Sequence, residues 1–374
     1  MGFGLFVPEF RTAFGLSSAT VGVVSSLGFL GMFAGLVIAQ ILLVRRGPGA
    51  PVLLGLLFAT AGMALVAAAP NLPILALGVF FAASSAGFAW TPFNDAVHRK
   101  IPDRDRPTAL SDISTGTSVG IVIAGLAAFL LVMTDLSWRS CWLAFAVAAA
   151  CSLFGNRMAL RDVEKAQRTG SQTHPSAILR ADAVPLFAIA FVFGIVSANY
   201  ISFAAGHVLD SGGVPGLPAA ATPPLLFVFY GLFGLAGLLA GLAKDRIGLP
   251  WLLRLLMLAG ALSAIVIAKA PAQWAGLLTS AALQGLYVMM TSAVLAFWSE
   301  RLFPAFPAMG FTAALLSAAA GSVLGPVLAG FVVESFGSGA MFLGTAALPV
   351  LTAVVLRDRH VRERPDRGTL CGRA

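Results

Sequence analysis

The chain has 374 residues, of which 58% are hydrophobic and only 11% are charged, whereas soluble domains carry roughly 25% charged residues. This composition excludes an ordinary soluble enzyme, a disordered protein and a fibrous repeat. The net charge of +8 is spread over short tracts between long apolar runs, which is typical of membrane proteins rather than of a nucleic-acid-binding face. We therefore expect an integral membrane protein that resides in a lipid bilayer and has no nucleic-acid partner.

Spans of about 20 apolar residues are long enough to cross a bilayer as helices. Such runs cover 20–44, 50–69, 73–96, 109–133, 138–160, 183–206, 222–243, 250–269, 273–298, 306–333 and 338–356. The longest polar gap between them is 161–182. The pattern predicts an N-terminal helix bundle over 1–160, a central loop over 161–182, a C-terminal bundle over 183–357 and a basic tail over 358–374.

Residues 1–8 resemble the final turns of a helix whose beginning is absent. Eight helical residues span about 12 Å, compared with the roughly 30 Å of the hydrocarbon core. We therefore expect an all-α polytopic membrane protein with 11 full transmembrane helices plus a truncated first helix. The alternative is a true eleven-helix protein with a short interfacial start.

The basic residues are distributed asymmetrically between the two sides that this helix count defines. If the central loop and the tail are cytoplasmic, only Arg11, Arg139 and Lys269 lie outside, and the remaining basic loops lie inside. The positive-inside rule then predicts a multi-pass protein of the inner membrane, with its central loop and C-terminus in the cytoplasm.

Two segments of the chain repeat at a constant offset. Three glycines of Gly116–Gly125 match three of Gly321–Gly330, which indicates two homologous halves. Small residues at this spacing let membrane helices approach closely. We therefore assign helix packing to Gly116, Gly120, Gly125, Gly321, Gly325, Pro326 and Gly330.

The segment Gly241-Leu-Ala-Lys-Asp245-Arg246-Ile-Gly248 resembles the Gly-x-x-x-Asp-Arg-x-Gly loop of the major facilitator superfamily, and Gly321–Gly330 with Pro326 resembles its Gly-Pro pattern. The resemblance implies a fold of two pseudo-symmetric helix bundles, with 12 helices when complete, and secondary active transport by alternating access between those bundles.

The resemblance also implies that the loop from Gly241 to Gly248 is a conformational latch. Gly241 and Gly248 allow a tight turn, Asp245 can accept hydrogen bonds from a helix N-terminus, and Arg246 can form a charge-assisted bond. The alternative is a solvated loop that merely obeys the positive-inside rule.

Polar groups within apolar spans are costly in lipid, so they face protein or a watery cavity. Because the first, fourth, seventh and tenth helices line the central cavity in the family, the resemblance implies substrate contacts on the seventh and tenth helices. The candidates are Asn199, Tyr200, Gln284 and Tyr287, joined by Thr91 and Ser118 as cavity residues, and Tyr230 is a further polar residue within a span. The alternative role for each is a hydrogen bond between helices.

Asp112 is the carboxylate that stands most clearly inside an apolar run, one turn from its cytoplasmic end. Burial would raise its pKa toward neutrality, which makes it a candidate for coupling to an ion such as a proton. The alternative is a helix N-terminal charge that the helix dipole favours.

The sequence carries no catalytic constellation, cofactor motif or metal-ligand cluster. Gly116-Thr-Ser118-Val-Gly120 matches a nucleophile elbow, but it lies within an apolar run where no strand is expected. We therefore expect no enzyme activity and no cofactor or metal, but a monomeric secondary transporter of a small solute. Sparse charge in the spans favours a neutral or amphipathic solute. The alternative is a non-transporting membrane sensor or an inactive, truncated remnant of this fold.

Overall fold

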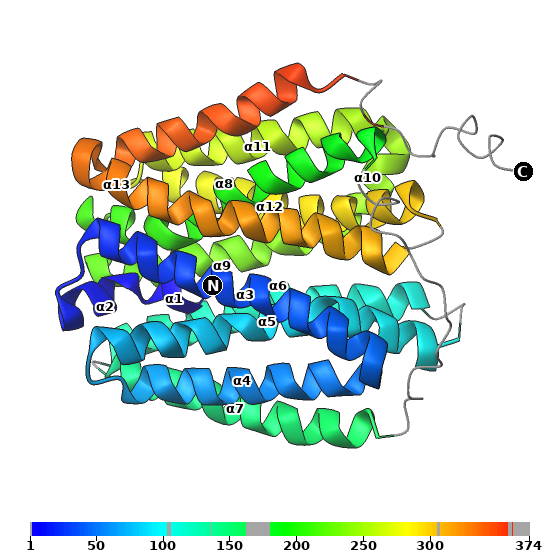
Figure 1. Cartoon of the computed structure of the whole chain (residues 1–374). Helices are drawn as coiled ribbons and strands as arrows, with labels where there is room; N and C mark the ends of the chain where they lie inside the picture. Colours follow the sequence, from blue (N-terminus) through cyan, green and yellow to red (C-terminus); the bar gives the residue numbers. More distant parts are fainter. Residues whose placement is uncertain are drawn as a thin grey trace, which may run out of the picture.

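The computed structural model describes residues 2–102, 106–134, 136–161, 180–304, 307–357 and 361, and all its regular elements are helices. The long helices lie side by side along one direction (Figure 1). We name the end at the right of Figure 1, which carries Arg45, Arg46, Lys244, Arg246 and Arg301, the basic end. The end at the left, which carries the turns at Gly15, Asn71, Ser137, Gly212 and Gly337, is the distal end.

The first set of helices precedes residue 161. It consists of α1 (Gly2–Leu5), α2 (Val7–Phe14), α3 (Ser18–Arg46), α4 (Gly49–Ala68), α5 (Leu72–Lys100), α6 (Arg106–Met133) and α7 (Trp138–Ala159). Hydroxyl and amide side chains cap three of these helices at the distal end, where Ser17, Asn71 and Ser137 accept hydrogen bonds from backbone N–H groups two or three residues on. These caps set the boundaries within a few residues of the predicted runs.

The second set follows residue 180. It consists of η2 (Ala181–Ala183), α8 (Val184–Asp210), η3 (Ala219–Ala221), α9 (Thr222–Gly234), η4 (Leu235–Leu239), α10 (Ala240–Ile247), α11 (Leu249–Lys269), α12 (Trp274–Leu302) and α13 (Pro307–Val355). One predicted span, 222–243, is thus built from α9, η4 and α10 in succession.

α13 contains two predicted spans. Its residue Gly337 has φ 81° and ψ 163°, which is not helical, so the chain reverses there between an arm over 307–336 and an arm over 338–355. Glycine adopts positive φ without the steric cost that a β-carbon brings. With α13 and the α9–α10 span each counted once, ten described helical stretches are long and apolar enough to cross a membrane. The predicted all-α polytopic fold is confirmed.

Close backbone contacts join the two sets. A β-carbon on Gly22 of α3 would collide with the carbonyl of Pro326 on α13, and one on Gly330 would lie 2.8 Å from the carbonyl of Ser18. On the other side of the molecule, a β-carbon on Gly125 of α6 would lie 3.0 Å from the carbonyl of Pro224 on α9. The sets therefore meet across α3–α13 and α6–α9, where glycines bring the backbones close.

The other glycines of the predicted packing set divide into two groups. Gly321 and Gly325 of α13 pack against α8, where their β-carbons would meet the backbone at Phe191 and Ile195. For Gly116 and Gly120 the packing role stays a prediction. A β-carbon on either meets no described atom within 4 Å, because both lie on an exposed part of α6.

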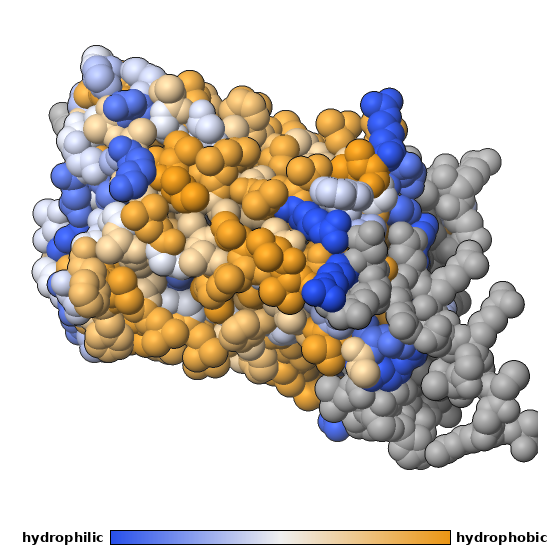
Figure 2. All heavy atoms as spheres, turned by 90° about the horizontal axis from the view of Figure 1, so that it is seen from above, coloured by the Kyte–Doolittle hydropathy of each residue, from blue (hydrophilic) through white to orange (hydrophobic). Residues whose placement is uncertain are grey.

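Large apolar side chains cover the middle of the molecule on its outside. Met158, Phe336 and Val354 are each at least 75% exposed. Figure 2 shows hydrophobic residues across the middle of the visible face and hydrophilic residues gathered at its two ends. This distribution is expected of a protein whose midsection contacts lipid.

Candidate functional site

All three tyrosines of the sequence are buried in the second set. Tyr200 of α8 stacks on Tyr230 of α9, with ring centroids 6.3 Å apart. The Tyr200 hydroxyl lies 2.9 Å from Oγ of Ser280 on α12, and the Ser280 hydroxyl donates to the carbonyl of Ser263 on α11. A chain of hydrogen bonds thus crosses three helices in the core of the second set.

Beside this chain lie polar groups that have no hydrogen-bond partner among the described residues. They are the hydroxyls of Tyr230 and Tyr287 and both amide atoms of Gln284. All three side chains are fully buried. Gln284 and Tyr287 stand three residues apart on α12 and share one helix face, as predicted from their spacing. An unpaired buried polar group costs about 1–3 kcal/mol, so a water or a ligand that pairs with these groups would stabilise the core. We call Tyr230, Gln284 and Tyr287 the unpaired cluster.

Asn199 lies in the same core but is partly satisfied. Its Nδ2 donates to Oγ1 of Thr345 on α13 at 3.0 Å, whereas its Oδ1 has no partner among the described residues. Tyr200 and Asn199 therefore make hydrogen bonds between helices, the alternative that the sequence left open. That leaves Gln284 and Tyr287 as the candidates whose polar atoms are free to bind a solute.

The remaining two cavity candidates lie where the first and second sets meet. Oγ1 of Thr91 on α5 lies 3.3 Å from Oγ1 of Thr312 on α13. Ser118 of α6 lies against Gly234 of α9, whose β-carbon would be 3.0 Å from the serine hydroxyl. Thr91 and Ser118 therefore lie at contacts between the sets, whereas the other four candidates lie within the second set. The side chain of Asp112 lies outside the described part of the structure, so its coupling role stays a prediction.

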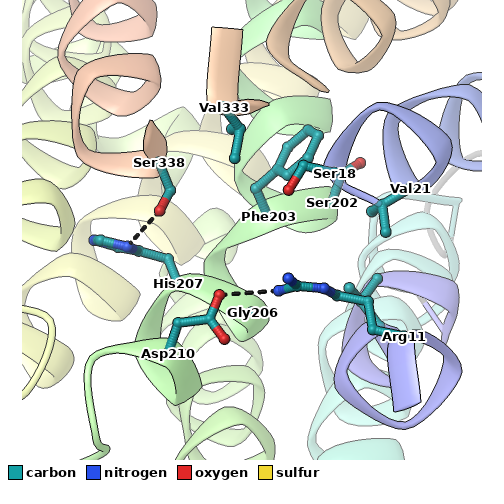
Figure 3. A pocket seen from close by; sticks show the side chains of 11 residues that line it. Arg11, Ser18, Val21, Ser202, Phe203, Gly206, His207, Asp210, Val333 and Ser338 are labelled. Carbon is teal, nitrogen blue, oxygen red and sulfur yellow. Dashed lines mark hydrogen bonds and ion pairs between the residues drawn. The ribbon is translucent and has the colours of Figure 1, made fainter. Parts of the chain in front are cut away.

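An ion pair joins the two sets at the distal end. Nη1 of Arg11 on α2 donates to Oδ2 of Asp210 on α8 at 2.9 Å (Figure 3). Nearby, Oε1 of Glu334 on α13 accepts a 3.0 Å hydrogen bond from the backbone N–H of Ala19, in the first turn of α3. A carboxylate at a helix N-terminus is favoured by the helix dipole. Both contacts pair a charged side chain of one set with a group of the other. We call them the distal clasp.

A small cavity of about 20 Å³ lies beside the distal clasp. It has room for about one water molecule. Its lining includes Arg11, Asp210, Ser202 and His207, and Figure 3 shows their side chains around it. The His207 ring lies between helices, with Nδ1 2.9 Å from Oγ of Ser338 and Nε2 3.1 Å from the carbonyl oxygen of Ile267.

At the basic end, the predicted latch residues are not engaged with the first set among the described residues. Asp245 is 72% exposed and lies 3.2 Å from Nζ of its neighbour Lys244. Gly248 has φ 79°, so it makes the tight turn that the motif predicts. The latch is expected to close when the basic end closes, and its role stays a prediction.

Sequence reasoning missed Asp210, Glu334 and His207. Each stands near the end of an apolar run, where a charged or polar residue is usually solvated. Only the fold brings Asp210 to Arg11 across 199 positions of sequence. The available signal was Arg11 itself, one of the few basic residues on the side opposite the basic loops.

Comparisons with known proteins place this geometry in context. The sequence model of the Major Facilitator Superfamily matches residues 1–225. No curated protein sequence matches the chain. Among solved structures, a mutant of the nucleoside transporter NupG superposes with a TM-score of 0.72 at 15% identity, over 95% of this chain and 93% of that one.

Two structures of a POT family transporter also superpose, one in complex with a thioalcohol-conjugated peptide and the other with 5-aminolevulinic acid. Each has a TM-score of 0.76 at 14% identity, and each covers 95% of this chain and 91% of the other. At such identities the likeness shows the fold.

Proposed function

Because the chain belongs to the major facilitator superfamily, we propose that it is a secondary active transporter that carries a small, neutral solute by alternating access. The observation that carries this proposal is the distal clasp. It holds the two sets together at one end through an ion pair and a helix cap, both of which can break and re-form. The rocking units are residues 1–160 and 183–357, with 161–182 as the linker.

The contacts between the sets support a rocking motion. They run along α3–α13 and α6–α9, where glycines such as Gly22, Gly125 and Gly330 bring the backbones close. Surfaces of small residues can tilt against each other without interlocking side chains, and inverted or parallel repeats in transporters move largely as rigid bodies. At the basic end, the Thr312 hydroxyl donates across the sets to Oε1 of Gln40 at 3.4 Å.

The chemistry of the unpaired cluster indicates the solute. Gln284 offers one donor group and one acceptor, and Tyr230 and Tyr287 offer hydroxyls that do both. The described residues that neighbour them in the core, such as Ser280 and Phe193, are uncharged. Because an unpaired charge is far costlier to bury than an amide, the cluster suits a neutral solute with hydrogen-bonding edges and a planar part that can lie against tyrosine rings.

The distribution of basic residues supports an orientation. The basic end would face the cytoplasm of the cell and the distal end the outside, in the inner membrane. The distal clasp would then close the outer entrance in this structure. A solute that reaches the unpaired cluster in this state would come from the basic end.

Solute flux is the decisive measurement. The purified chain is reconstituted in proteoliposomes, and counterflow is measured with radiolabelled nucleosides, peptides and 5-aminolevulinic acid, probes chosen because the names of the structural neighbours include such ligands. The expected result is counterflow of at least one neutral probe, absent from protein-free vesicles and reduced by Gln284→Leu. Binding of a probe without counterflow would overturn the proposal in favour of a membrane sensor.

A further inference from the structure

We propose that the solute is held by a carboxamide or lactam group, and that Ser197 on α8 and Gln284 on α12 bind this group from two helices. The inference rests on the proposed function and deepens it, because it names the chemical group that the second set recognises. Ser197 is a further binding residue, which the sequence did not single out.

Ser197 and Gln284 each bring a buried polar group without a partner. Oγ of Ser197 and both amide atoms of Gln284 make no hydrogen bond with any described residue. Ser197 is 7% exposed and Gln284 is fully buried. Elsewhere in the second set, the hydroxyls of Ser280 and Ser322 donate to carbonyl oxygens of neighbouring helices. Ser197 and Gln284 therefore have hydrogen-bonding capacity that the described packing of the second set does not use.

Two contacts between α8 and α12 fix how these groups lie relative to each other. In the first contact, the Tyr200 hydroxyl lies 2.9 Å from Oγ of Ser280. In the second, the ring centroids of Phe193 and Tyr287 lie 5.6 Å apart. α8 runs from the basic end to the distal end and α12 runs back, so the two helices are antiparallel.

Ser197 and Gln284 take matching positions between these contacts. Ser197 lies four residues after the α8 member of the second contact and three before that of the first. Gln284 lies four residues after the α12 member of the first contact and three before that of the second. At about 100° per residue, each is turned by about 40–60° from the contacts, in the same rotational sense. Because the helices are antiparallel, these equal turns bring both residues to the same side, level to within about one residue.

That side faces the first set of helices. A β-carbon on Gly4 of α1 would collide with the carbonyl of Ile201 on α8. Ile201 lies four residues after Ser197, hence on the same face of α8. A solute group between Ser197 and Gln284 would therefore lie where the two sets meet, which is where alternating access requires a binding site.

A primary amide with both of its polar atoms free is complementary to a second amide. Nε2 of Gln284 can donate to the C=O of the solute while Oε1 accepts from its N–H. A carbonyl oxygen has two lone pairs, so the same C=O can also accept from the Ser197 hydroxyl. A ketone offers no N–H to Oε1, and a carboxylate would bring a charge that no described neighbour pairs. The group that satisfies all three atoms is a neutral amide.

The test measures binding and needs no transport. Nicotinamide is neutral and joins a carboxamide to a planar ring, whereas its methyl ketone analogue keeps the ring and the C=O but lacks the N–H. Each ligand is titrated into the purified chain in detergent, and the rise in melting temperature gives the dissociation constant. We expect nicotinamide to bind about tenfold tighter than the ketone, because the ketone leaves Oε1 of Gln284 unpaired.

The two binding residues should respond differently. Gln284→Leu should weaken nicotinamide binding by about tenfold or more and abolish the difference between the ligands, since nothing remains to accept from the N–H. Ser197→Ala should weaken both ligands by about fivefold and keep the difference, since the serine contacts only the C=O. A purely structural role would change stability but not the ratio of the two affinities. Ser299→Ala is the matched control, because this buried hydroxyl donates to Ala296 within α12.

Equal affinities of the parent chain for the two ligands would overturn the amide assignment, and an unchanged affinity in Ser197→Ala would remove the serine from the site. No rise in melting temperature with nicotinamide would assign ordered water alone to these groups, which also overturns the inference. If Gln284→Leu does not elute as a single species, Gln284→Met replaces it. Counterflow of another solute without nicotinamide binding refutes this inference alone, whereas nicotinamide binding without any counterflow refutes the proposed transport.

Discussion

The guanidinium of Arg11 and the carboxylate of Asp210 lie 2.9 Å apart although 199 positions separate them in the chain. They belong to different sets of helices, and their bond crosses the line along which the sets meet. Their side chains are 35% and 56% exposed, so solvent screens the pair and it contributes about 0–1 kcal/mol. A pair of this strength can break at little cost, as the proposed alternating access requires.

Breaking this pair should expose the cavity behind it. In Arg11→Gln, a cysteine placed at the buried cavity residue Ser202 should react with a membrane-impermeant maleimide faster, by up to about fivefold for a loss of about 1 kcal/mol. The reversed pair, Arg11→Asp with Asp210→Arg, should restore the slow rate. Arg139→Gln is the matched control, because Arg139 donates to Ala67 within the first set. Equal rates in the parent and in Arg11→Gln would contradict this role.

Replacing the buried amide of the unpaired cluster should separate stability from activity. Gln284→Leu removes an amide with no described partner and fills the site with an apolar group of similar size. We expect an unchanged or higher melting temperature together with a raised half-saturating solute concentration. The control is Gln273→Leu, at an exposed position on the distal end. A lower melting temperature with unchanged kinetics would indicate that Gln284 is structural.

Close packing within the second set should be sensitive to a single methyl group. A β-carbon on Gly194 of α8 would collide with the carbonyl of Ala318 on α13. Gly194→Ala should therefore lower the free energy of unfolding by about 1–3 kcal/mol, measured by thermal denaturation in detergent. Gly344→Ala is the control, since its β-carbon meets no described atom within 4 Å. Similar melting temperatures for the two variants would refute the packing assignment.

The latch prediction can be tested through rates rather than stability. Asp245 is exposed in this structure and paired only with its neighbour Lys244 among the described residues. If it caps a helix when the basic end closes, Asp245→Asn should slow counterflow without changing the melting temperature. Asp182→Asn, another carboxylate at the basic end, serves as the control. The latch is discarded if both variants transport at the parent rate.

The fold was largely predictable, because the positions of the helices depend on apolar runs and helix-breaking residues that can be read from the local sequence. Runs of about 20 apolar residues predict every long helix, and the separate runs 306–333 and 338–356 correspond to the two arms that meet at Gly337. The 3₁₀ stretch η4 inside one span was not predicted, since Leu235–Leu239 is as apolar as its flanks. Gly125 faces another helix, whereas a β-carbon on Gly116 or Gly120 meets no described atom within 4 Å. Spacing alone does not say which face of a helix is turned to a neighbour.

The candidate site was harder to predict, because the hydrogen-bond partners of a buried side chain depend on how the helices pack. Spacing placed Gln284 and Tyr287 on one face of α12. It could not distinguish them from Tyr200, whose hydroxyl is satisfied by Ser280. Asp210 and His207 looked like ordinary residues at a helix end. Asp210 contacts Arg11 of α2 and His207 contacts Ser338 of α13, and both helices lie far away in sequence.

The reversal at Gly337 brings two hydrogen bonds of α13 close together in the chain, one made by Glu334 and one made by Ser338. Ser338, which holds the imidazole of His207, follows Gly337 directly, and Glu334, which caps α3, precedes it by three residues. Only Gly337 separates the two arms of α13, so the Glu334 contact between the sets and the Ser338 contact within the second set lie four residues apart in the chain. A displacement of α13 at this end would therefore act on both contacts. An insertion at Gly337 would change the placement of Ser338 relative to Glu334 and leave the hydrogen bonds inside each arm in place.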